Sequence, residues 1–461
     1  MTTVALIGLV AFGVALLLVL IIVVRIQAFA ALLLASMVVA VLGGVPLAEI
    51  PAVIQEGMGR TLGYIAIVVG LGAMLGQLLQ VSGGAERVAR TLLGRLGEER
   101  APWALGLTGL IVATPVFFDV ALILFIPLVY GLARRSGRSL LYYAIPLLAG
   151  LAVAHSFIPP TPGPVAVASL IGADLGWVIA VGLLAGIPAT VVGGIFFGRT
   201  IAGRMHLRVP EYMLPEVNPG PASVSTESSS TAPAADAELP GFGLVLALIG
   251  VPLSLILLGT VSRVTLGDGH PLRALFALIG HPFAALLVAT LLAFWLLGTR
   301  RGYSAEEVRK VATAGLEPVG MIILVTGAGG VFGNVLVAAG VGDALASLMA
   351  GSAMPVVVLA FLIATVVRVA QGSATVAMVT AAGIVAPVIQ AGSYPPPMLG
   401  ALTIAIAAGA TVLSHVNDSG FWLVSRFLGM SEAETLRSWT VMVTLVGLVG
   451  FAVALAFSAF L

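Results

Sequence analysis

The 461-residue chain contains no cysteine and few charged residues. The lack of cysteine excludes disulfide bonds, thiolate metal sites and cysteine nucleophiles. Charged side chains make up 9% of the sequence, whereas a soluble domain carries about 25%, so a water-soluble globular fold is excluded. The net charge of +1 offers no basic surface of the kind that binds nucleic acid.

Apolar residues dominate instead, forming 60% of the chain with a mean hydropathy of +1.15. They occur in unbroken runs of about 20 residues, the length with which an α-helix crosses a bilayer, whereas strands of a β-barrel alternate residue by residue. The sequence therefore predicts an all-α polytopic membrane protein. Full-length spans are predicted at 4–24, 26–46, 62–82, 175–198, 241–261, 274–298, 313–338 and 440–460.

Four segments interrupt the remaining apolar stretches. Two lie in the first half, at 114–119 (TPVFFD) and 155–164 (HSFIPPTPGP), and two in the second half, at 368–375 (RVAQGSAT) and 415–420 (HVNDSG). Irregular backbone at membrane depth is tolerated only where it is buried in protein or lines an aqueous cavity. We therefore expect the four interruptions to meet near the bilayer midplane and to form the functional site.

Arginine-rich segments flank residues 101–133 on both sides, at 83–100 and 134–138. Because arginine concentrates in cytoplasmic loops, both flanks are expected inside the cell. Each arm of 101–133 has about 13 residues and would reach roughly 20 Å, which is short of a hydrocarbon core of ~30 Å. The segment is therefore expected to form a re-entrant hairpin that enters and leaves on the cytoplasmic side.

A shift of 257 residues aligns the two halves of the chain. It places GLGAMLGQ (70–77) over GAGGVFGN (327–334) and brings the interruptions of one half over those of the other. The second expected hairpin, 352–390, has uncharged flanks and would enter from outside, so the halves are inverted. We predict ten spans and two opposed re-entrant hairpins with broken helices near the midplane, an architecture typical of secondary transporters. The expected units are an N-terminal repeat (1–210), a disordered cytoplasmic linker (211–240) and an inverted C-terminal repeat (241–461).

Three charged residues lie within the apolar stretches, in or beside an interruption: Asp119, Arg368 and Asp418. Ionisable residues are costly in a membrane and are functional candidates by default. The alternative is a structural ion pair, for example between Arg368 and Asp418. His155 and His415 open the broken segment of their halves, and a histidine can exchange a proton near physiological pH. Asp119, Asp418, His155 and His415 are therefore the candidates for proton coupling.

Small polar residues provide hydroxyl and amide groups where backbone is already exposed. Such residues also often back-bond to the preceding helical turn, which remains the alternative for each. The candidate substrate contacts, including the arginine, are Thr114, Thr161, Arg368, Gln371, Ser373, Thr375, Asn417 and Ser419.

Signatures of other chemistries are absent from the sequence. It has no Walker A loop, which disfavours ATP-driven transport by this chain, and no HExxH pair or clustered metal ligands. No cofactor is therefore expected, and neither is an enzymatic activity.

At its four interruptions the sequence resembles the gluconate:proton symporter (gluconate permease) family. The resemblance covers nearly the whole chain and continues through residues 434–440 (ETLRSWT). It implies proton-coupled uptake of a small sugar acid across a bacterial inner membrane. Members of the family also move idonate, fructuronate, glycerate and D-serine. This chain departs from the family pattern at Thr161, where a histidine is common, and in its long Ser/Ala/Pro-rich linker.

Three other functions stay open at this point. A sodium-coupled carboxylate transporter could share the inverted-hairpin plan, since backbone carbonyls at helix breaks can also hold Na⁺. A passive organic-anion channel and a membrane enzyme are further alternatives. The pattern is compatible with an elevator or a rocking motion and leaves homo-oligomerisation open; the expected partners are a sugar acid or hydroxy acid, protons and the lipid bilayer.

Overall fold

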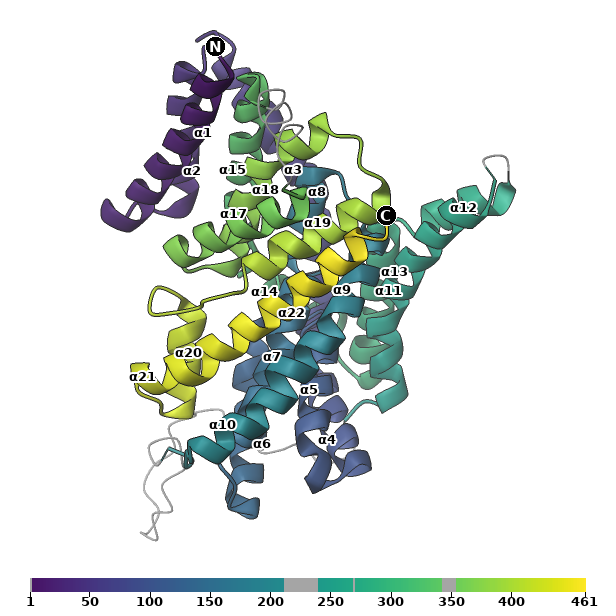
Figure 1. Cartoon of the computed structure of the whole chain (residues 1–461). Helices are drawn as coiled ribbons and strands as arrows, with labels where there is room; N and C mark the ends of the chain where they lie inside the picture. The colour runs from purple at the N-terminus through teal and green to yellow at the C-terminus, as the bar shows by residue number, and fades with distance from the viewer. Residues whose placement is uncertain (1, 211–238, 268–269, 342–353) are drawn as a thin grey trace.

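The computed structural model describes residues 2–210, 239–267, 270–341 and 354–461, and these residues form helices with no β-strand (Figure 1). The first half contains α1 (Thr3–Leu18), η1 (Val19–Val23), α2 (Ala28–Leu42), α3 (Ile50–Val81), α4 (Gly84–Leu96), η2 (Glu98–Arg100), α5 (Ala101–Val112), α6 (Phe118–Ser136), α7 (Leu141–Phe157), α8 (Pro162–Ile171), α9 (Leu175–Ala189), η3 (Thr190–Phe196) and α10 (Phe197–Arg204).

The second half contains α11 (Phe242–Thr265), α12 (Pro271–Ile279), α13 (Pro282–Ala293), η5 (Phe294–Gly298), η6 (Thr299–Arg301), α14 (Ala305–Ala314), α15 (Val319–Ala338), α17 (Val356–Gln371), α18 (Ala374–Ala391), α19 (Pro396–Gly409), α20 (Ser419–Leu428), α21 (Glu432–Thr435), η7 (Leu436–Thr440) and α22 (Val441–Ser458).

Eight helical segments in the described ranges are long and apolar enough to cross a membrane. They are Ile50–Val81, Leu141–Ile171, Leu175–Arg204, Phe242–Thr265, Pro282–Arg301, Val319–Ala338, Ala374–Ala391 and Glu432–Ser458. The predicted all-α membrane fold is thus confirmed, while the count of ten spans stays a prediction. The segment expected at 26–46 forms only the 15-residue helix α2, and α3 begins twelve residues before the expected start at 62 because Pro51 initiates a helix there.

The helices break where the sequence predicted interruptions. Residues 113–117 separate α5 from α6, and 158–161 separate α7 from α8, where a run of prolines removes N–H donors and restarts the helix at Pro162. Gly372, with φ +84°, ends α17 before Ser373 caps α18. Residues 410–418 separate α19 from α20, which Asp418 caps.

Glycines on α3 let two of these breaks approach its backbone closely. A Cβ atom on Gly76 would lie 1.9 Å from the carbonyl oxygen of Pro115, and one on Gly72 would lie 3.3 Å from the Pro160 side chain. The helix surface is therefore shaped to receive irregular backbone.

Replacing Gly76 by alanine is expected to destabilise the protein, because the new methyl group would collide with the Pro115 carbonyl. Overpacking of this kind costs about 1–3 kcal/mol or more. Gly63→Ala on the same helix is the matched control, since nothing lies within 4 Å of its added Cβ. Thermal unfolding in detergent measures both variants, and equal midpoints for the two would contradict this account of the packing.

Helices of the two halves pack against one another rather than forming two separate bodies. In the core of the molecule α15 packs on α3 and α2, α18 packs on α8, and α19 packs on α9 (Figure 1). Most of the linker expected at 211–240 lies outside the described residues, and the boundaries of the predicted repeats stay predictions.

Candidate functional site

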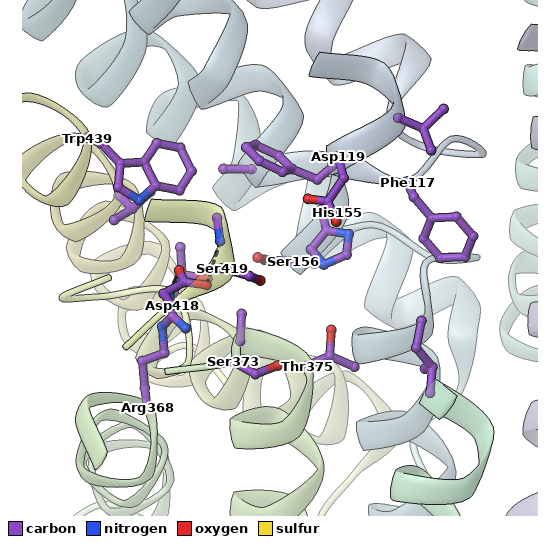
Figure 2. Close-up of a pocket in the computed structure, with 18 of the residues that line it drawn as sticks. Phe117, Asp119, His155, Ser156, Arg368, Ser373, Thr375, Asp418, Ser419 and Trp439 are labelled. Atoms are coloured by element: carbon purple, nitrogen blue, oxygen red, sulfur yellow. Dashed lines mark hydrogen bonds and ion pairs between the residues drawn. The ribbon is translucent and has the colours of Figure 1, made fainter. Parts of the chain in front are cut away.

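A cavity of about 290 Å³ lies where the broken helices meet. Its lining includes the start of α6, the end of α7, the break between α17 and α18, the start of α20 and one residue of η7 (Figure 2). Single residues of α15, α22 and the break after α19 also line it. Seven of the predicted site residues line it: Asp119, His155, Arg368, Ser373, Thr375, Asp418 and Ser419. Positions that are distant in the sequence are thus brought into one polar cavity.

One wall of the cavity carries Asp119, His155 and Ser156 (Figure 2). Asp119 sits in the first turn of α6, where backbone N–H groups favour a negative charge. Its side chain makes no hydrogen bond or ion pair within the described chain. His155 lies in the last turn of α7 and interacts electrostatically with Asp119. Its Nδ1 atom is buried and has no hydrogen-bond partner among the described residues.

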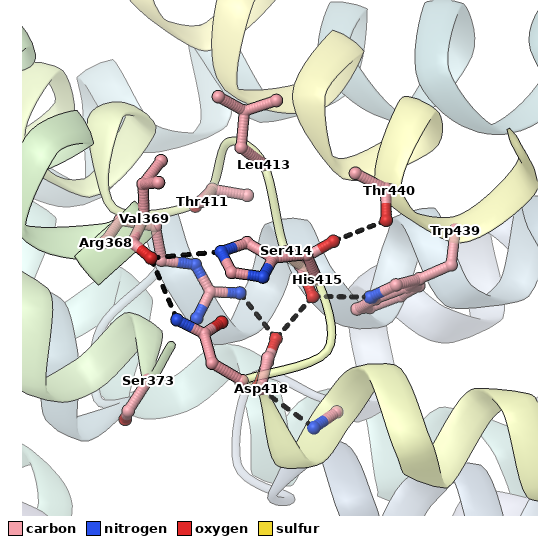
Figure 3. Close-up of polar contacts among 12 residues, drawn as sticks. Arg368, Val369, Ser373, Thr411, Leu413, Ser414, His415, Asp418, Trp439 and Thr440 are labelled. Atoms are coloured by element: carbon pink, nitrogen blue, oxygen red, sulfur yellow. Dashed lines mark hydrogen bonds and ion pairs between the residues drawn. The ribbon is translucent and has the colours of Figure 1, made fainter. Parts of the chain in front are cut away.

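The opposite wall is organised around Asp418 (Figure 3). Arg368 Nη2 and the Ser414 hydroxyl each donate to Asp418 Oδ2 at 2.5 Å, and the Gly420 N–H donates to Oδ1 at 3.0 Å. Trp439 Nε1 in turn donates to Ser414 Oγ at 2.7 Å. Both oxygens of this carboxylate are therefore occupied, in contrast to those of Asp119.

Arg368 is only partly satisfied by this network. The residue is 3% exposed, and its Nε and Nη1 atoms are buried with no hydrogen-bond partner in the described chain. Buried polar groups are nearly always hydrogen-bonded, and an unpaired buried donor is costly. Each vacant N–H of this guanidinium can donate a charge-assisted hydrogen bond, which suits an anionic ligand such as a carboxylate.

His415 and Asn417 stabilise the broken backbone instead of lining the cavity. His415 Nε2 lies 3.0 Å from the carbonyl oxygen of Val369, and Asn417 Nδ2 donates to the same oxygen at 2.8 Å (Figure 3). Since a carbonyl only accepts, the histidine donates here. Both side chains satisfy a carbonyl at the end of α17, which has no partner within the helix.

Three further predicted contacts also lie outside the main cavity. The Thr114 hydroxyl donates to the Leu110 carbonyl at 3.0 Å and the Thr161 hydroxyl to the Ile158 carbonyl at 2.6 Å. This is the back-bonding that we considered as the alternative. Both line a gap of about 10 Å³ that is too small for a sugar acid. The Gln371 amide is buried without a partner among the described residues.

Sequence reasoning missed several residues of the cavity. Ser156 lies next to His155, and Thr411 lies in the break after α19, so position alone could have suggested both. Trp439 belongs to η7 and carried no signal, because only the tertiary packing brings it to Ser414. Its ring also lies 5.5 Å from that of Phe118, centroid to centroid, and so connects the two walls. No group of three or more His, Asp or Glu residues in the described ranges is arranged to hold a metal ion.

Comparisons with known proteins show the family to which the chain belongs. Residues 5–460 match the model of the GntP family of permeases. The low-affinity gluconate transporter of Escherichia coli K12 is 42% identical, over 98% of this chain and 97% of its own length. The inner membrane permease YgbN of the same organism is 40% identical, over 98% of both chains.

A solved structure shares the fold at low sequence identity. The YdaH transporter of Alcanivorax borkumensis superimposes with a TM-score of 0.58 at 15% identity, covering 89% of this chain and 90% of that one. With eight candidate spans and relatives of this kind, the chain is a multi-pass protein of the bacterial inner membrane, as predicted. Permeases move solutes rather than transform them, so it is no enzyme. The chain belongs to the GntP family of permeases.

Proposed function

We propose that the protein is a secondary active transporter that takes up gluconate, or a related small hydroxy acid, together with protons. The observation that carries this proposal is that Arg368, which has two vacant donors, and Asp119, whose carboxylate makes no hydrogen bond or ion pair among the described residues, line opposite walls of one cavity. Gluconate transport by a relative that is 42% identical supports the choice of substrate class.

The cavity offers groups that match both ends of a hydroxy acid. The substrate carboxylate would accept a hydrogen bond from a vacant donor of Arg368, and the hydroxyls would contact Ser373, Thr375 and Ser419. Ser156 is added as a contact from the other wall. In this conformation Thr114, Thr161 and Asn417 bond to backbone carbonyls at the helix breaks, so we assign them positioning roles instead of direct contact. Gln371 does not line the cavity in this conformation and receives no contact role.

Asp119 is the better of the two aspartates to carry the coupling proton. Both oxygens of Asp418 accept hydrogen bonds and one pairs with Arg368, whereas Asp119 lines the cavity and makes no hydrogen bond or ion pair with any described residue. Taking up a proton there would remove one negative charge as an anion enters, which lowers the electrostatic cost of a charged substrate at membrane depth. His155, beside Asp119, is the candidate second proton carrier. His415 already holds the Val369 carbonyl and receives no such role here.

Inverted repeats with two opposed re-entrant hairpins remain part of the proposal. The helix bounds support it: the 257-residue shift lays α8 (Pro162–Ile171) over α20 (Ser419–Leu428) and the end of α3 over α15 (Val319–Ala338). α5 and α6 would form the cytoplasmic hairpin, and α17 and α18 the external one. Alternating exposure of the two breaks would then carry the substrate across.

Uptake of labelled D-gluconate into liposomes containing the purified protein tests the proposal. An imposed inward pH gradient is expected to drive accumulation, and a protonophore is expected to abolish it. Accumulation under a sodium gradient alone would favour the sodium-coupled alternative. Equilibration without accumulation, and without saturable counterflow, would favour a channel.

A further inference from the structure

A second polar cavity lies far from the site described above. Its volume is also about 290 Å³, and residues of α3, α8, α15 and α18 line it. Helix α18 runs between the two cavities: Ser373 lines the first, and Gln390 near the other end lines the second. At 1.5 Å per residue these positions are about 25 Å apart.

Donor groups in this cavity are largely free. Thr61 is 5% exposed and Ser169 is half-buried, and neither hydroxyl makes a hydrogen bond in the described chain. Arg60 is the single charged residue among the described residues that line the cavity. Its ion pair with Glu56 spans 3.8 Å and both side chains are more than 60% exposed, so this pair is weak and leaves the guanidinium available to another anion.

Acceptor groups complete the lining. Asn334 Nδ2 donates to the Val53 carbonyl at 2.9 Å, and Gln390 Nε2 donates to the Leu170 carbonyl at 3.4 Å. Because each amide nitrogen is thus engaged with backbone, the two amide oxygens remain as acceptors for hydroxyl groups. The cavity therefore combines one cation, hydroxyl donors and amide acceptors, which is the set that a polyhydroxylated carboxylate requires.

Tight packing separates the two cavities in this conformation. A Cβ atom on Gly163 of α8 would lie 2.6 Å from the sulfur of Met378, and one on Gly329 of α15 would lie 2.1 Å from the Val379 side chain. The helix surfaces on both sides of α18 are therefore in direct contact between the cavities. A ligand in the second cavity is distinct from one at Arg368.

The second cavity lies at the end of the molecule that faces the outside of the cell. It is formed by the first turns of α3 and the last turns of α8 and α18. The arginines of α4 and those at the end of α6 lie at the opposite end (Figure 1). Arginine-rich ends are cytoplasmic, which puts Arg60 on the external side.

We propose that this cavity is a second, external binding site for the hydroxy-carboxylate, with Arg60 holding its carboxylate and Thr61 and Ser169 contacting its hydroxyls. The inference rests on the proposed function, since the ligand is the transported class of anion. A site of this kind would collect the substrate outside before the packing around Met378 opens toward the central cavity.

A single cysteine tests the site without relying on transport, because the native chain contains none. In cells that carry the Ser169→Cys variant, a membrane-impermeant maleimide added outside is expected to label the introduced cysteine. D-gluconate is expected to slow the labelling severalfold in a saturable way. The same protection is expected in an Arg368→Gln background, where the central site is disabled, and is expected to vanish in an Arg60→Gln background.

Arg273→Gln, which removes an arginine of α12 at the same end of the molecule, is the matched control and is expected to keep the protection. Should Arg368→Gln fail to reach the membrane, the charge-balanced double variant Arg368→Gln/Asp418→Asn replaces it, since it also removes the Arg368 donors of the central site. Three outcomes would each overturn the inference. The first is that the introduced cysteine is not labelled at all, the second that gluconate fails to protect it in the Arg368→Gln background, and the third that gluconate still protects it in the Arg60→Gln background. Uptake of gluconate by the wild-type chain is measured in parallel. If the wild-type chain transports gluconate but gluconate does not slow the labelling, the second site is refuted and the proposed function stands.

Discussion

Replacing Arg368 by glutamine is expected to abolish saturable uptake of gluconate. The change removes the vacant Nε and Nη1 donors that we assign to the substrate carboxylate, together with the Nη2 contact to Asp418. The planar guanidinium can bind Asp418 through Nη2 and still direct its other N–H groups to a second anion, a fixed geometry that the single ammonium group of a lysine cannot reproduce. Arg368→Lys is therefore expected to lose most of the uptake as well, although it retains the charge. Counterflow of labelled gluconate in liposomes measures both variants.

Loss of folding must be separated from loss of binding in this experiment. Removing one partner of a buried ion pair costs about 3–5 kcal/mol, because the other charge stays buried and unpaired. The double variant Arg368→Gln/Asp418→Asn removes both charges and is expected to recover much of the thermal stability while remaining inactive. If this variant folds and takes up gluconate at the wild-type rate, Arg368 serves only as the structural partner of Asp418.

Replacing Asp119 by asparagine is expected to uncouple transport from the proton gradient. The amide is nearly isosteric but carries no exchangeable carboxyl proton, so counterflow of gluconate would continue while accumulation driven by pH would be lost. Asp119 is suited to this role because it lines the cavity and has no partner within the described chain. Accumulation and counterflow, measured on the same liposomes with and without a pH gradient, separate the two effects.

Two controls define the outcome for Asp119. Glu98→Gln removes an exposed carboxylate of η2 outside the cavity and is expected to leave the pH dependence unchanged. Asp418→Asn is expected to impair binding and exchange as well as accumulation, since it removes the partner of Arg368. Full accumulation driven by pH in both aspartate variants would refute the assignment of the coupling proton to either residue.

Patterns in the sequence predicted the helical membrane fold and the positions of its breaks. Apolar runs separated by arginine-rich loops predicted a helical membrane protein, because backbone groups in lipid must be hydrogen-bonded within the helix. The breaks at 158–161 and around Gly372 follow from local chemistry, namely prolines without N–H groups and a glycine that adopts a positive φ. The start of α3 was misplaced because residues 50–61 are less apolar than a span, although they continue the same helix.

For the candidate site, the sequence identified the charged residues but not the orientation of their polar neighbours. Asp119, His155, Arg368 and Asp418 could be selected from sequence, because ionisable groups are costly among apolar residues. The sequence alone does not distinguish residues that line the cavity from residues that bond to the backbone of the helix breaks. His415 and Asn417 point to the Val369 carbonyl, while Ser373 faces the cavity, a difference of orientation that only the folded backbone defines.

By itself the sequence determined that this protein is a helical membrane protein with four polar breaks, since hydropathy and helix-breaking residues act locally along the chain. The tertiary structure alone decided which polar groups are left without partners. Arg368 and Asp418 are 50 residues apart, and whether the guanidinium is satisfied depends on the packing of α17 against the break before α20. Hydrogen bonding is short-ranged and directional, so the vacant donors of Arg368, the free carboxylate of Asp119 and the cavity beside Arg60 exist only once the halves have packed together.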